Sequence, residues 1–199
     1  MEWLKIGFLA SHGGSNMQAI VDACRNGKLY GEAKAVISNN SGSGAIERAR
    51  KHGIPHYHLS SATHSDPESL DRAIYHALTD NGVTLIVLAG YMKKLGPLTL
   101  RHYKGRILNI HPSLLPKYGG HGMFGSKVHE AVLANRETVT GATIHLADEE
   151  YDTGAIVNQR EVAVLPDDTA ETLAARVLQC EHELFVETLV KISEGQIVL

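Results

Sequence analysis

Asn109 and His111 are the first residues whose types and spacing suggest chemistry. They interrupt the apolar run "ILNIH", which has the composition of a buried β-strand, and Pro112 ends that strand. Alternate residues of a strand face the same side, about 6.6 Å apart at about 3.3 Å per residue. One interpretation is a pair of hydrogen-bonded polar groups in the core. We favour a site, because both side chains point together at a strand end, where ligands of open α/β sheets bind.

Asp152 could form a proton-transferring pair with His111. It follows the acidic turn "DEEY" and precedes Thr153 and Gly154, where the chain re-enters the apolar run "AIV". Acidic runs are usually solvated turns, but Asp152 lies at the apolar end of this one. A carboxylate beside an imidazole favours the charged ring. We therefore expect Asp152 to raise the pKa of His111 and to provide an acid that works near neutrality.

The segment "ASHGGSN", residues 10–16, could bind an anion. Gly13 and Gly14 allow backbone amides to approach a ligand closely. Ser15 and Asn16 could cap the following helix, whose dipole favours negative charge at this end. The alternative is an ordinary tight turn. The patterns G-x-x-x-x-G-K-[ST] and G-x-G-x-x-G are both missing, and the next strand ends in "ISNN" without an acid for a ribose. A monophosphate therefore suits the segment better than a dinucleotide.

Glu181 interrupts the apolar stripe of the last predicted helix. Its neighbours at helical spacing are Val177, Leu178, Leu184 and Phe185. Because a desolvated carboxylate is costly unless it is paired, Glu181 either ends the buried face or meets a polar ligand.

These candidate residues lie within an alternating pattern of strands and helices. Up to Gly90 the runs predict the order β-α-β-α-β-α-β, with helices over "SNMQAIVDACRNG", "SGAIERARKHG" and "PESLDRAIYHAL". Beyond Gly90 we expect a short helix to Tyr103, the "ILNIH" strand, a helix over "SKVHEAVLAN", two strands joined by the acidic turn, and a last helix over residues 168–192. Parallel strands need crossover connections. The sequence therefore predicts a single open, twisted, mostly parallel α/β sheet with helices on both faces, in one domain over residues 1–199.

Composition narrows the class of partner. The chain has 19 basic and 22 acidic residues, a formal charge of -3, and no basic block that would indicate nucleic acid or an anionic membrane. Its apolar runs are well short of the ~20 residues that span a bilayer, and no secretory signal pattern is present. The spacing of Cys24, Cys180 and the 12 histidines indicates no disulfide framework and no metal site. We expect a cytoplasmic monomer or homodimer with small-molecule substrates, without metal, nucleic acid or membrane.

Five motifs resemble those of the folate-dependent formyltransferases. They are "SHGGSN", "LAGYMKKL", "ILNIHPSLLPKY", "GATIHLADEEYDTGAIV" and "ARVLQCEHELF", in the order of that family and over nearly the whole chain. The glycine loop and the "CEH" helix are similar to those of members that act on glycinamide ribonucleotide. The resemblance implies a Rossmann-like formyltransferase fold. It also implies transfer of a formyl group from 10-formyltetrahydrofolate to the amine of glycinamide ribonucleotide, in purine biosynthesis.

The resemblance further implies a role for individual residues. Asn109 and a protonated His111 would stabilise an oxyanion, while Asp152 handles the proton. Glu181 would contact the ribonucleotide, and its phosphate would be held by Gly14, Ser15 and Asn16. The folate pocket would be lined by Met92, Lys93, Lys94, Leu95, Asp148, Glu149, Glu150 and Tyr151.

Some positions depart from the family pattern. Pro67 and Lys93 stand where members have residues directed at the folate, and Leu178 replaces a polar contact to the ribonucleotide. The loop "GGHGMFGS" is longer than in the shortest members, and its glycines would permit a lid. These departures concern the folate and ribose contacts and not the chemistry.

Related enzymes use the same three catalytic residues on other acceptors. Those that act on methionyl-tRNA or on water carry an additional domain, for which we expect no room in 199 residues. The two alternatives are a formyltransferase for a sugar-nucleotide amine and a non-catalytic module that binds folate or nucleotide.

Overall fold

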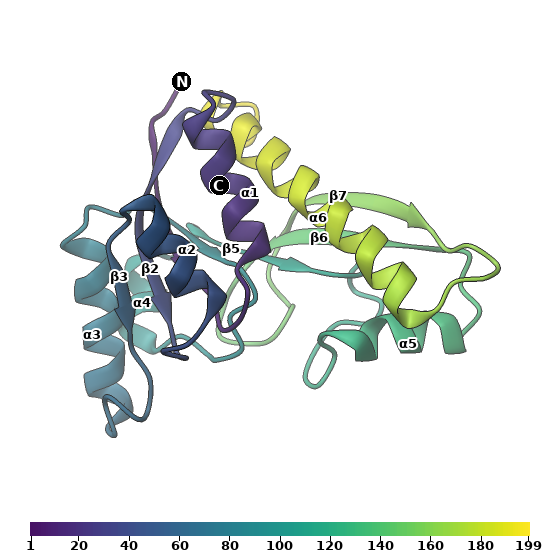
Figure 1. Ribbon diagram of the computed structural model, residues 1–199, viewed down its shortest axis with the longest axis horizontal. Helices are drawn as coiled ribbons and strands as arrows, with labels where there is room; N and C mark the ends of the chain where they lie inside the picture. The colour runs from purple at the N-terminus through teal and green to yellow at the C-terminus, as the bar shows by residue number, and fades with distance from the viewer.

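The short apolar runs of the sequence form one seven-stranded sheet in the order β3-β2-β1-β4-β5-β6-β7 (Figure 1). The computed structural model describes residues 1–199. Its strands are β1 (Leu4–Leu9), β2 (Gly31–Ser38), β3 (His56–His58), β4 (Leu85–Leu88), β5 (Ile107–His111), β6 (Val139–Leu146) and β7 (Ile156–Ala163). Strands β1 to β5 are parallel, and β6 runs antiparallel to both β5 and β7. The predicted open, mostly parallel sheet is confirmed.

Helices cover both faces of this sheet, as predicted. They are α1 (Ser15–Arg25), α2 (Gly44–His52), α3 (Pro67–Thr79), α4 (Pro97–His102), α5 (Ser126–Ala134) and α6 (Ala170–Ser193). The larger core cluster lies between the sheet and α1, α2, α5 and α6, and a smaller one lies under α3 and α4. Figure 1 shows α6 crossing the sheet beside α1. None of the six helices combines the length and the apolar composition that crossing a bilayer requires.

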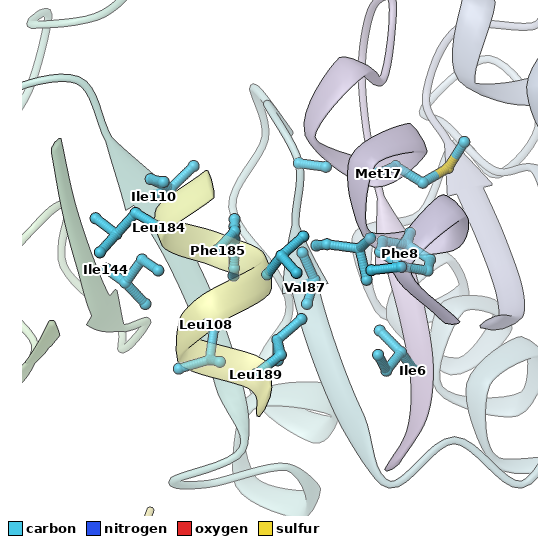
Figure 2. Packing of buried hydrophobic residues seen from close by; sticks show 14 of the residues in the cluster. Ile6, Phe8, Met17, Val87, Leu108, Ile110, Ile144, Leu184, Phe185 and Leu189 are labelled. Atoms are coloured by element: carbon cyan, nitrogen blue, oxygen red, sulfur yellow. The ribbon is translucent and has the colours of Figure 1, made fainter. Parts of the chain in front are cut away.

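The apolar stripe of α6 fixes this helix against the centre of the sheet. Figure 2 shows Leu184, Phe185 and Leu189 packed towards the strand residues Val87 and Leu108. Phe185 and Leu189 are fully buried, and burying one such side chain contributes about 1.5–3 kcal/mol. This packing holds Glu181, one turn before Phe185, at a defined height above the sheet.

The start of α1 differs from its prediction. Neither Ser15 nor Asn16 caps the helix. Gly14 occupies the N-cap position with a φ of 68°, and no side chain accepts a hydrogen bond from the first-turn amides. Glycine adopts a left-handed φ without strain, but it has no side chain that could accept hydrogen bonds from those amides. The first turn of α1 therefore keeps its amide donors free.

The strand order creates a switch point between β1 and β4. From β1 the chain builds β2 and β3 on one side, and it then returns to place β4 and β5 on the other. Loops that leave the carboxyl ends of adjacent strands at such a point diverge, and ligands bind in the crevice between them. The segments that follow β1, β4 and β5 all lie at this edge of the sheet.

Candidate functional site

The end of β5 forms the floor of a cavity of about 310 Å³. β5 lies inside the sheet, between β4 and β6. Asn109 is half-buried and His111 is 4% exposed, and both line the cavity. Asn109 and His111 point to the same side of β5, as expected for two residues separated by one position in a strand.

Asp152 lies beside His111, as predicted, but it also contacts a second imidazole. Asp152 Oδ2 is 3.4 Å from Nδ1 of His111, and Asp152 Oδ1 is 3.4 Å from Nε2 of His145. The backbone N–H of Gly120 donates to Asp152 Oδ2 at 3.0 Å. Asp152 has a φ of 59°, and a non-glycine residue held in the left-handed region is a feature that clusters at functional sites. The carboxylate is therefore fixed between two histidines.

His145 is a site residue that the sequence analysis missed. It lies on β6 directly opposite Asn109 of β5, and the Asn109 Nδ2 is 3.1 Å from His145 Nε2. His145 as a whole is 2% exposed. The signal was present in the predicted strand "GATIHLADE", where one histidine stands among buried aliphatic residues. The sequence pattern did not indicate that His145 would lie beside Asn109, because the pairing of β5 with β6 is a tertiary contact.

The predicted rise in the pKa of His111 is wrong. Burial lowers the pKa of His111 below its ordinary value, and this outweighs the raising effects of the Asp152 charge and the hydrogen bond to Tyr118. Nε2 of His111 donates to the carbonyl oxygen of Tyr118 at 2.7 Å. Burial also favours a neutral Asp152, but the hydrogen bond from His145, the His111 charge and the Gly120 amide hold its pKa below the usual range. The ground state near neutrality is a neutral His111 beside an ionised Asp152.

Asn16 and Glu181 meet at the other end of the large cavity. Nδ2 of Asn16 donates to Glu181 Oε2 at 2.8 Å, which joins the start of α1 to α6. Glu181 is 7% exposed and lines the cavity with Asn16. Burial raises the pKa of Glu181 to about 7, although the hydrogen bond from Asn16 lowers it. Glu181 lies within the buried face of α6 and does not end it, and its partner within the chain is Asn16; contact with a polar ligand stays a prediction.

The predicted phosphate residues occupy two kinds of position. Asn16 lines the cavity, whereas Gly14 and Ser15 belong to the turn that leads to it. The Asn16 Oδ1 is buried and has no hydrogen-bond partner. A buried acceptor without a partner costs about 1–3 kcal/mol, so a ligand donor would find a vacant place here.

A second, smaller cavity of about 70 Å³ lies beside the first. The predicted folate residues that line it are Lys93, Lys94, Leu95, Asp148, Glu149, Glu150 and Tyr151, whereas Met92 lines the larger cavity instead. Residues that the prediction missed are Leu88, Tyr91, Leu100, His145 and Ala147. Both cavities share Tyr91, Asn109, Tyr151 and Asp152. Two of the catalytic candidates, Asn109 and Asp152, therefore stand at the junction of the two cavities, and His111 lines the larger one.

Lys94 crosses the mouth of the small cavity. Its Nζ donates to the carbonyl oxygen of Glu149 at 2.9 Å, lies 3.7 Å from a carboxylate oxygen of Glu150, and sits 4.9 Å from the ring centroid of Tyr151. These contacts tie the segment after β4 to the acidic turn before β7. The two sequence segments predicted to share one pocket do lie together.

Two of the departures from the family pattern, Pro67 and Leu178, lie outside the cavity walls, whereas Lys93 lines the small cavity. Pro67 is the first residue of α3, and Leu178 on α6 is 39% exposed; neither lines either cavity. The glycine loop does line the large cavity, through residues 120–125. No group of three or more His, Cys, Asp or Glu side chains is arranged to hold a metal ion.

Comparison with known proteins relates both sequence and fold to one family. Residues 4–189 match the family described as formyl transferase. The chain is 36% identical over 194 residues to phosphoribosylglycinamide formyltransferase of Escherichia coli K12, which covers 98% of this chain and 89% of that protein. The structure is similar to that of glycinamide ribonucleotide transformylase 1 from Symbiobacterium toebii, with a TM-score of 0.91 and 36% identity, over 99% of this chain and 91% of the other.

A plant relative is longer than this chain. The chloroplastic phosphoribosylglycinamide formyltransferase of Vigna unguiculata is 43% identical over 195 residues, and the match covers 98% of this chain but 62% of the relative. The chain thus spans less than two thirds of that protein.

Proposed function

The chain belongs to the formyl transferase family, and from this premise we propose that it transfers the formyl group of 10-formyltetrahydrofolate to the amine of glycinamide ribonucleotide, in purine biosynthesis. The observation that carries the proposal is the position of Asn109 and Asp152, which line both cavities. Two cavities that meet at polar, buried groups suit a reaction between two substrates. The names of the relatives from E. coli and V. unguiculata support the same acceptor.

The chemical step is an attack of the amine on the formyl carbon. The nitrogen lone pair forms the new C–N bond, negative charge develops on the formyl oxygen, and the bond to N10 of the folate then breaks with its electron pair. Asn109 carries an N–H donor at the junction of the cavities. One donor of this kind contributes about 10²–10³ in rate. The proton lost by the amine passes through Asp152, directly or by way of water, towards N10.

The lowered pKa of His111 fits a role that begins in the transition state. In the free protein burial keeps the imidazole neutral, with Nε2–H on the carbonyl of Tyr118. An oxyanion nearby raises the pKa of the ring, so the one proton that leaves the amine can pass to Nδ1, which faces Asp152, before it returns through Asp152 to N10 of the folate. The charged imidazolium then stabilises the oxyanion. An interaction made only as the charge develops accelerates the step, whereas one already present with bound substrate does not.

The ribonucleotide occupies the large cavity in this proposal. Its phosphate lies at the uncapped start of α1, where the amides of Gly14, Ser15 and Asn16 and the helix dipole attract an anion. Its ribose hydroxyls lie near Glu181. A hydroxyl can also donate to Asn16 Oδ1, which has no partner within the chain.

The folate occupies the small cavity between the segments 91–95 and 147–152. The apolar side chains Leu88, Leu95 and Leu100 line one part of it, and the acidic turn lines another. Flat heterocycles bind between apolar walls when a few polar groups fix their orientation. Residues 93–95 and 148–151 keep their proposed role as folate contacts, and Met92, predicted with them, lines the larger cavity.

We extend the proposal to the molecule as a whole: one domain over residues 1–199, present in the cytoplasm as a monomer or homodimer, and acting on small molecules. A gel-filtration run with light scattering would give the oligomeric state.

An acceptor panel tests the proposed function. Purified protein would be mixed with 10-formyltetrahydrofolate and either glycinamide ribonucleotide, a sugar-nucleotide amine or buffer alone, and the absorbance of tetrahydrofolate followed. Product with glycinamide ribonucleotide only supports the proposal. Product with the sugar nucleotide only would move the acceptor to that class, and product in buffer alone would make the protein a hydrolase. Binding of either ligand without product in any mixture would indicate a binding module.

A further inference from the structure

Helix α2 braces the loop between β1 and α1. The N–H of Ala45 donates to the carbonyl oxygen of His12 at 3.1 Å, and Nε of Arg48 donates to the carbonyl oxygen of Gly13 at 2.8 Å. A Cβ atom on Gly44 would lie 3.1 Å from that same Gly13 oxygen. Two consecutive carbonyl groups of the loop are therefore held towards α2 by two donors.

These contacts determine where the loop amides point. In a planar trans peptide the C=O and the following N–H point in opposite directions. The only cis peptide bond is Leu115–Pro116. Because the carbonyls of His12 and Gly13 point towards α2, the N–H groups of Gly13 and Gly14 point away from it. The space that a Cβ of Gly13 would occupy is open, with no atom within 4 Å. The loop thus adds donors to the uncapped first turn of α1.

Arg48 carries a positive charge at this place without a carboxylate partner. Besides the Gly13 carbonyl it contacts only the side-chain oxygen of Gln18, through Nη1 at 3.2 Å, so both of its acceptors are neutral. Its second terminal nitrogen, Nη2, makes no hydrogen bond. Burial, and after it the nearby charge of Arg48, lower the pKa of His182 on α6, and the buried Nε2 of His182 has no hydrogen-bond partner. Backbone donors from the start of α1 and the side chain of Arg48 from α2 therefore lie together at this loop, and Arg48 forms no ion pair with an acid of the chain.

We propose that Arg48 is a positioning residue for the substrate phosphate: it turns the Gly13–Gly14 peptide so that its N–H faces the anion, and it supplies the charge that the site otherwise lacks. The inference rests on the proposed function, since it assumes a phosphorylated acceptor. It adds Arg48 as the residue that orients the Gly14 amide, and the matching contact from Ala45 to His12 adds the amide of Gly13 to the residues 14–16 that bind the phosphate. Arg48 belongs to neither cavity wall, so its effect reaches the substrate through the loop.

The kinetic test compares acceptors with and without the phosphate. Arg48→Met keeps the length of the side chain and removes its donors and charge. We expect KM for glycinamide ribonucleotide to rise about 10- to 100-fold, the loss typical of hydrogen bonds to charged groups. We expect kcat to stay within about threefold, and kcat/KM for the dephosphorylated glycinamide riboside to be unchanged. Equal losses with both acceptors would mean that Arg48 only supports the fold, and would overturn the proposal.

A matched control lies on the same helix. Arg50 of α2 is exposed and makes no side-chain hydrogen bond or ion pair, so Arg50→Met should leave KM for both acceptors unchanged. Arg48→Lys restores the charge without the planar group that holds Gly13, and KM should lie between those of wild type and Arg48→Met. A KM for Arg48→Lys as high as that for Arg48→Met would argue against the role of the charge.

A binding experiment keeps the inference separate from the proposed reaction. Inorganic phosphate would be titrated into the ¹⁵N-labelled wild-type protein and the amide resonances of Gly13, Gly14 and Ser15 followed by NMR. We expect these signals to shift together, with an affinity that Arg48→Met lowers at least tenfold. This result would stand even if the acceptor proved to be another phosphorylated amine. If phosphate left the Gly13 and Gly14 signals of the wild-type protein unshifted, the inference would be overturned, whatever reaction the protein catalyses. This wild-type result does not depend on whether Arg48→Met folds.

Discussion

Asn109 and His145 face each other across β5 and β6, with 3.1 Å between Nδ2 and Nε2, and the same His145 nitrogen lies 3.4 Å from Asp152. One imidazole therefore connects the amide that would stabilise the oxyanion to the carboxylate that would move the proton. His145 lies beside both groups at a buried position on β6. We expect it to position them.

Replacing His145 by alanine should shift the pH dependence of the reaction. The hydrogen bond from His145 is the largest of the effects that lower the pKa of Asp152, so without it the carboxylate protonates at higher pH. We expect the acid limb of the kcat profile to move upward, and kcat at its plateau to fall by less than the ~10²–10⁴ that a general acid or base contributes. His76→Ala, at an exposed position of α3, is the control. An unmoved acid limb would contradict this role.

Removing the amide of Asn109 should slow the chemical step. For Asn109→Ala we expect kcat to fall by about 10²–10³, the cost of one oxyanion donor. KM for both substrates should change little, because the lost interaction forms mainly in the transition state. Steady-state kinetics, with thermal unfolding as a check on the fold, measures this. Turnover within a few-fold of wild type would refute the assignment.

The buried carboxyl of Glu181 should make stability fall with rising pH. Its pKa is raised to about 7 in the folded protein, so the folded state binds the proton more tightly than the unfolded state does. The stabilisation is fully present below the ordinary glutamate pKa and is lost as the pH rises through about 7. At 1.36 kcal/mol per pKa unit, ionising this group costs about 3 kcal/mol at high pH.

Glu181→Gln measures that cost. A glutamine keeps an oxygen that can accept from Asn16 and does not ionise. Urea unfolding at pH 5 and pH 8 should show similar stability for both proteins at pH 5, and a variant more stable by up to about 3 kcal/mol at pH 8. The exposed neighbour Glu183→Gln should show no such difference. An equal effect of Glu181→Gln at both pH values would mean that the carboxyl does not titrate in this range.

Gly154 should tolerate no side chain. A Cβ atom there would overlap the carbonyl oxygen of Leu146, so Gly154→Ala must displace the turn that carries Asp152. We expect a loss of about 1–3 kcal/mol in stability, together with a fall in kcat, since Asp152 leaves its two histidines. Gly42→Ala adds a Cβ in open space and should change stability by about 0.5 kcal/mol or less. Thermal unfolding and kcat of the two variants test the contrast.

Local pattern was enough to predict most of the fold. The alternation of apolar runs and helical stripes gave the order of strands and helices and the two-sided cover of the sheet. It also placed Asn109 and His111 together, because the period of a strand is a local property. The start of α1 was predicted less well. Ser15 and Asn16 are residue types that often cap helices. In the structure Gly14 occupies the N-cap position in a left-handed conformation, and the Asn16 side chain donates a hydrogen bond to Glu181 instead.

The electrostatics of the site could not be predicted in the same way. The prediction for His111 considered the charge of Asp152 and not the depth of the ring in the protein. Burial has the larger effect and the opposite sign. His145 was missed for a related reason, since its partners come from β5 and from the turn before β7. Distances between separate segments, and the degree of desolvation, depend on packing that no local pattern describes.

The fate of the formyl carbon tests the central claim most directly. 10-Formyltetrahydrofolate labelled with ¹³C in the formyl group would be mixed with the protein and glycinamide ribonucleotide, and the carbon followed by NMR. We predict that the label appears as a formamide on the ribonucleotide amine, in an amount equal to the tetrahydrofolate formed. Label released as free formate, or label that stays on the folate while both substrates are bound, would contradict the proposal.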